Sequence, residues 1–106
     1  MQTFDLSQMG KGWFVGNFEP AAYLTSDCEV AVKHYHAGDR EAAHFHKVAT
    51  EITVVVSGEI RMMGKTWKPG DIVVLSPGEV TDFEAVTDAI NVVVKLPGAS
   101  DDKLLA

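Results

Sequence analysis

The chain has 106 residues, of which 46% are hydrophobic and 23% are charged, and its formal net charge at pH 7 is -6. This length fits one domain with one hydrophobic core and leaves no room for two. Duplex nucleic acid and anionic membranes are bound through clustered Lys and Arg. The basic residues here are scattered singly along the chain, so we expect neither as a partner.

Cysteine content and hydropathy narrow the class further. Cys28 is the single cysteine, which excludes an intrachain disulfide and a cysteine-based zinc site. No apolar run is long enough for a transmembrane helix. The first residues lack the positive start and apolar stretch of a signal peptide, so we expect a cytoplasmic location.

Taken in chain order, the predicted elements are short strands between turn-forming residues. Residues 1–29 are the least regular part, with a weak strand at 13–18, and their aromatic residues are expected at a core edge or a dimer interface. Segments rich in Val, Ile and Thr then predict strands at 30–36, 51–56, 60–63, 71–75, 81–85 and 89–96. We expect the tail, 100–105, to form a short turn of helix. The pattern predicts an all-β sandwich or barrel.

The chemistry is concentrated in His44-Phe45-His46. Alternate residues of a strand face one side, so His44 and His46 project together, about 7 Å apart along the strand. A turn through residues 48–50 would bring Glu51 beside them. Two imidazoles and one carboxylate form a ligand set for Fe, Mn, Zn, Ni or Co that leaves positions open for substrate.

The wider pattern is Gly38-x5-His44-x-His46-x4-Glu51-x6-Gly58, followed by two Pro-Gly turns at 69–70 and 77–78. This resembles the cupin superfamily over about residues 30–96. The resemblance implies one domain over 1–106, with a double-stranded β-helix (jelly-roll) barrel at 30–96 and an edge segment at 1–29. It also implies homodimers and one divalent metal per chain on His44, His46 and Glu51.

The usual fourth ligand of that family, a histidine, is replaced here by Thr81. Three outcomes are open: a three-ligand site with an extra open position, replacement of the histidine by Asp82 through a bulge, or a site that binds metal poorly. Strand alternation itself places Thr81 inward and Asp82 outward.

Residues that could contact a small-molecule ligand lie on neighbouring strands. Lys33 and Tyr35 share one strand face, and if this face lines the cavity they would hold an anionic substrate or move a proton. Thr53 shares a face with Glu51 and is expected to line the pocket below it, and Thr81 marks the open side of the metal site.

These patterns favour a metal-dependent enzyme of the dioxygenase, isomerase or decarboxylase type, acting on a small oxygen-bearing metabolite. A second hypothesis is a non-catalytic module that binds or senses a sugar or small acid. The third is an interaction protein whose histidine pair is incidental. The fold alone does not decide among them.

Overall fold

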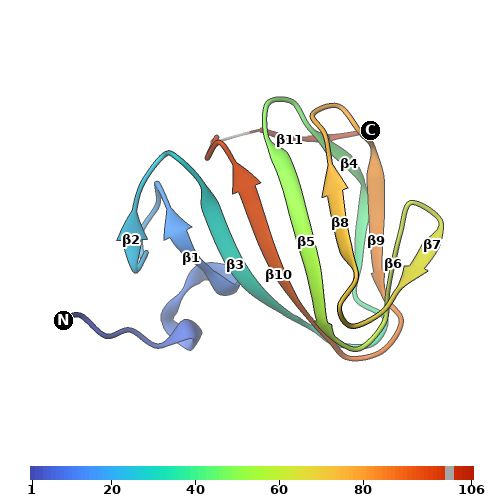
Figure 1. Ribbon diagram of the computed structural model, residues 1–106, viewed down its shortest axis with the longest axis horizontal. Helices are drawn as coiled ribbons and strands as arrows, with labels where there is room; N and C mark the ends of the chain where they lie inside the picture. Colours follow the sequence, from blue (N-terminus) through green and yellow to red (C-terminus); the bar gives the residue numbers. More distant parts are fainter. Residues whose placement is uncertain (100–101) are drawn as a thin grey trace.

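The computed structural model describes residues 1–99 and 102–106, which form short strands wrapped into a barrel (Figure 1). The N-terminal region holds two 3-10 turns and two short strands. The elements are η1 (Leu6–Gln8), η2 (Gly10–Gly12), β1 (Trp13–Gly16), β2 (Tyr23–Leu24), β3 (Glu29–Tyr35), β4 (Arg40–His46), β5 (Thr50–Ser57), β6 (Ile60–Met62), β7 (Lys65–Trp67), β8 (Ile72–Leu75), β9 (Thr81–Ala85), β10 (Ala89–Leu96) and β11 (Lys103–Leu105).

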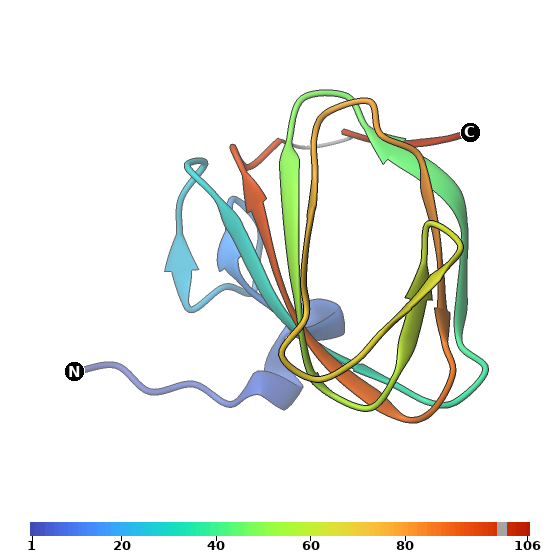
Figure 2. The ribbon, with the colours of Figure 1, turned by 45° about the vertical axis from the view of Figure 1, so that its right-hand side comes forward.

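Two sheets make the barrel. One has the strand order β2-β1-β3-β10-β5-β8, and the other has the order β11-β4-β9-β6-β7. Figure 2 shows the two sheets facing each other, with the chain crossing repeatedly from one to the other. This arrangement confirms the predicted all-β, double-stranded β-helix barrel. No helix within the described ranges is long and apolar enough to cross a membrane.

The interior of the barrel is polar toward one end and mainly apolar toward the other, because the inward-facing residues of a strand are polar near one end of it and apolar near the other. On β5 the inward residues run from Glu51 through Thr53 to Val55. At the Val55 end, a buried cluster with Ile60 and Phe83 forms the apolar core. The metal-ligand candidates lie toward the other end of the strands and are not part of this cluster, although its member Leu75 pairs with Glu51.

The tail differs from the sequence prediction. A helical turn was expected at 100–105, but residues 103–105 form strand β11, which pairs antiparallel with β4; residues 100–101 lie outside the described part of the chain. The prediction was wrong because β4 would otherwise present unpaired N–H and C=O groups at the edge of its sheet, and pairing with a distant segment outweighs local propensity.

Candidate metal centre

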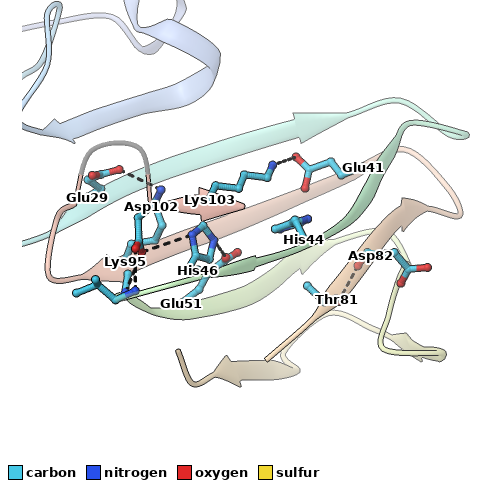
Figure 3. Close-up of polar contacts among 12 residues, drawn as sticks. Glu29, Glu41, His44, His46, Glu51, Thr81, Asp82, Lys95, Asp102 and Lys103 are labelled. Carbon is cyan, nitrogen blue, oxygen red and sulfur yellow. Dashed lines mark hydrogen bonds and ion pairs between the residues drawn. The ribbon is translucent and has the colours of Figure 1, made fainter. Parts of the chain in front are cut away.

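His44, His46 and Glu51 converge at the polar end of the barrel (Figure 3). The two histidines lie on β4 and are 4% and 7% exposed, and Glu51 follows on β5 after a short turn. One ligand atom from each residue lies within 4.8 Å of the others. The period-two spacing and the turn therefore bring together the three residues that the sequence predicted, and this group could hold a metal ion.

The hydrogen bonds of these residues suit a metal site. His46 Nε2 donates to Glu51 Oε2 over 2.7 Å. His44 Nδ1 donates to the backbone oxygen of Ala42 over 2.8 Å, which fixes the tautomer and leaves the Nε2 lone pair for an ion. Burial raises the pKa of the Glu51 carboxyl, but the hydrogen bond from His46 and the histidine charges outweigh it and lower the pKa. The Glu51 carboxyl is thus ionised, and a divalent cation would take the place of the proton that His46 Nε2 shares with it, because metal ligands bind in their deprotonated form.

A β-bulge in β4 adds a carboxylate that strand alternation does not predict. The register between β4 and β9 pairs Glu41 with Phe83 and His44 with Thr81, so one extra residue lies between Glu41 and His44. The shift turns Glu41 and His44 to the same side of the strand, although they are three residues apart. Glu41 lines the cavity as a result.

Asp102 is a second carboxylate that sequence reasoning missed. Its side chain is 4% exposed, and its Oδ2 lies 3.8 Å from Nδ1 of His46. It accepts hydrogen bonds from the backbone N–H groups of Val48 (2.7 Å) and Ala49 (2.9 Å). His46 Nδ1 is itself buried without a hydrogen-bond partner among the described residues. Asp102 therefore fixes the turn between two ligands and lies where it can orient His46.

The candidate metal ligands face a cavity of about 230 Å³. Lys33 and Tyr35 line it, so the inward-facing alternative for their strand face is the observed one. The Tyr35 ring packs on Phe83 with centroids 4.4 Å apart. Burial, with further contributions from nearby carboxylates, raises the pKa of the Tyr35 phenol, which keeps its proton and can donate a hydrogen bond. Trp13 also lines the cavity, so the N-terminal segment forms part of its wall.

The other predicted contact residues lie away from the cavity wall. Thr81 is 4% exposed and its hydroxyl donates to the backbone oxygen of Asp82 over 2.7 Å. Asp82 is exposed and borders a different hollow, on the outer face. Thr53 is buried one inward position beyond Glu51. Within the described residues, neither Thr53 nor Thr81 is among those lining the cavity.

Known proteins were compared with this chain in sequence and in structure. The sequence matches no protein-family model and no curated protein. Its structure is similar to an uncharacterized conserved protein with a double-stranded β-helix domain from Klebsiella pneumoniae subsp. pneumoniae, with a TM-score of 0.70 and 32% identity over 77% of this chain and 72% of the other.

Two further solved structures share the fold at lower identity. KdgF from Halomonas sp. has a TM-score of 0.65 and 22% identity over 73% of this chain and 76% of its own. The DMSP lyase DddQ from Ruegeria pomeroyi has a TM-score of 0.69 and 21% identity over 89% of this chain and 49% of its own.

Proposed function

Because this chain belongs to the cupin superfamily, we propose that it binds one divalent transition metal on His44, His46 and Glu51 and acts as a metal-dependent enzyme on a small oxygen-bearing metabolite. The observation that carries the proposal is the convergence of these three ligand atoms within 4.8 Å, at a cavity wall. Three protein ligands leave positions for a substrate, whereas a purely structural site would be closed.

The surrounding residues suit dioxygenase, isomerase or decarboxylase chemistry. A bound Fe, Mn, Zn, Ni or Co ion would supply Lewis acidity or, for iron, a site for dioxygen activation. Tyr35 keeps its proton because its pKa is raised by burial, and it can donate a hydrogen bond to a substrate oxygen.

The test is elemental analysis of protein purified without added metal. Wild type should contain about one equivalent of a transition metal per chain, and His46→Ala should lose most of it while keeping the folded barrel, since His46 is not part of the apolar core cluster. His34→Ala is the matched control because His34 is exposed on the outer face. Metal retained by His46→Ala at the wild-type level would contradict the ligand assignment.

The alternative function is a non-catalytic module that binds a sugar or small acid. It is favoured by Thr81, which stands where the family usually has a ligand histidine and whose hydroxyl is bonded to its own chain. The two functions differ in the fate of the ligand. If metal-loaded protein returns every bound small acid or sugar unchanged after prolonged incubation, the binding module is the better description.

The homodimer expected for this family is also a proposal, and the outer face of the large sheet supports it. This face is made mainly of aliphatic side chains, with the imidazole of His34 beside Ile90 and no Asp, Glu, Lys or Arg, so two molecules of net charge -6 could meet there with little repulsion. Three of its members, Val56, Ile72 and Val74, are 52%, 61% and 56% exposed. The aliphatic residues of the face are Val30, Val32, Ile52, Val54, Val56, Ile72, Val74, Ile90, Val92 and Val94.

Light scattering after gel filtration tests this surface. Wild type should have the mass of two chains, and Val74→Glu should have the mass of one, because a buried unpaired carboxylate opposes association. Val80→Glu is the control, since Val80 is similarly exposed (47%) but lies outside the face. A monomeric wild type would refute the dimer.

A further inference from the structure

The fold gathers positive charge that is dispersed in the sequence. Four of the seven lysines in this acidic chain, Lys11, Lys33, Lys95 and Lys103, line the cavity of the candidate metal centre. They come from η2, β3, β10 and β11, so only the folded chain brings them together. Such a cluster attracts anions into a cavity whose low-dielectric walls strengthen the field.

Two of these lysines already have carboxylate partners. Lys95 Nζ lies 3.1 Å from Glu29 Oε1, and the two side chains are only 15% and 14% exposed. The Lys95 ammonium also lies 4.8 Å from the centroid of the Trp13 ring, within the range of a cation–π contact. Lys103 is more exposed, and its Nζ lies 3.9 Å from Glu41 Oε1. Figure 3 shows this ion pair as a dashed line.

Lys33 differs from these two. It is half-buried, and within residues 1–99 and 102–106 its ammonium forms no ion pair. The Lys33 ammonium lies over the Trp13 ring, with the ring centroid 5.8 Å from Nζ. Burial lowers the pKa of the Lys33 ammonium. The charge of Glu41 acts to raise this pKa, whereas the charges of Lys11, Lys103 and Lys95 lower it further. Glu41 offsets only part of the desolvation of this ammonium, and no carboxylate in the described part of the chain pairs with it.

We infer that the ligand of this cavity is a small organic acid whose carboxylate binds Lys33, with Lys95 and Lys103 flanking it. The inference rests on the proposed function and names the substrate class for that site. One oxygen function of the acid faces His44, His46 and Glu51, and a separate carboxylate accepts hydrogen bonds from Lys33. A cavity of about 230 Å³ is smaller than the pockets that hold drug-sized molecules, so the acid is small.

Malate and lactate are suitable probes because they share a 2-hydroxycarboxylate group and differ by one further carboxylate. Their affinities are measured by titration calorimetry on metal-free and metal-loaded protein. A charged hydrogen bond accounts for about tenfold to hundredfold in affinity, so malate should bind about tenfold or more tightly than lactate. Lys33→Met should reduce the affinity for malate to that for lactate and leave the affinity for lactate unchanged.

Lys65→Met is the matched control, because Lys65 is exposed on β7 and does not line the cavity. Lys33→Gln is a second variant in case methionine disturbs packing, and thermal unfolding checks that each variant is folded. The inference is overturned if wild type binds malate no more tightly than lactate, or if the preference survives in folded Lys33 variants.

The same titrations separate this inference from the metal proposal. A malate preference that depends on Lys33 in metal-free protein supports the acid-binding role even if elemental analysis finds no metal. Stoichiometric metal without any malate preference keeps the metal centre and overturns the role of Lys33.

Discussion

Replacing Asp102 by alanine tests how the C-terminal strand supports the metal-ligand turn. The substitution removes the acceptor of two backbone N–H groups, those of Val48 and Ala49. Ala49 is 2% exposed, and a buried donor left unpaired costs about 1–3 kcal/mol. The Val48 N–H is partly buried and should cost less because water can reach it. We expect a total loss of about 2–4 kcal/mol, a large part of the roughly 5–15 kcal/mol of a typical domain.

Denaturant unfolding measures this loss as a lower midpoint with an unchanged slope. Asp82→Ala is the control, since Asp82 is exposed on the outer face, and a surface change of this kind should stay within about 0.5 kcal/mol. We also expect Asp102→Ala to weaken metal binding by about tenfold, because a carboxylate next to a ligand histidine orients it. An Asp102→Ala protein as stable as the control would refute the reasoning.

Three further predictions concern backbone, ligand set and pH. Gly58→Ala should lower the midpoint of thermal unfolding more than Gly38→Ala does. Both glycines have positive φ, but a Cβ at Gly58 would lie 2.0 Å from a backbone oxygen, whereas a Cβ at Gly38 would have no atom within 4 Å. Thr81→His should tighten metal binding in a chelator competition, because Thr81 pairs with His44; unchanged affinity would argue against a fourth ligand position there. The preference for malate over lactate should fall as the pH rises through the pKa of Lys33, which lies below the ordinary 10.5, because deprotonation removes the charge of Lys33. A preference that calorimetry finds unchanged from pH 7 to 10.5 would contradict this prediction.

The parts of the site that were predictable from sequence depend on short-range geometry. His44 and His46 share a face because a strand has a period of two, and Glu51 returns beside them through a tight turn. The strands themselves were predictable because Val-, Ile- and Thr-rich segments alternate with Gly- and Pro-containing turns. Both signals lie within a few residues and need no knowledge of distant pairing.

The parts that were missed depend on long-range pairing or on one irregular position. Asp102 reaches His46 only because residues 103–105 pair with β4, and no local pattern in the tail indicates this. Glu41 faces the cavity because of the bulge, whereas alternation counted back from His44 places it outside. The lysine cluster likewise combines four elements, so single basic residues in the sequence gave no sign of it.

The bulge in β4 accommodates one extra residue without changing the side to which its flanking residues point. Deleting Ala42 or Ala43 would leave Glu41 two residues before His44, and a regular ladder would keep Glu41 opposite Phe83 and His44 opposite Thr81. A relative one residue shorter at this point would thus hold the same carboxylate beside the same metal ligands. A chain of the present length without the bulge would instead turn Arg40 toward the cavity and Glu41 away from it. Two relatives of different length in β4 can therefore have the same cavity charge, and two of equal length can differ in it.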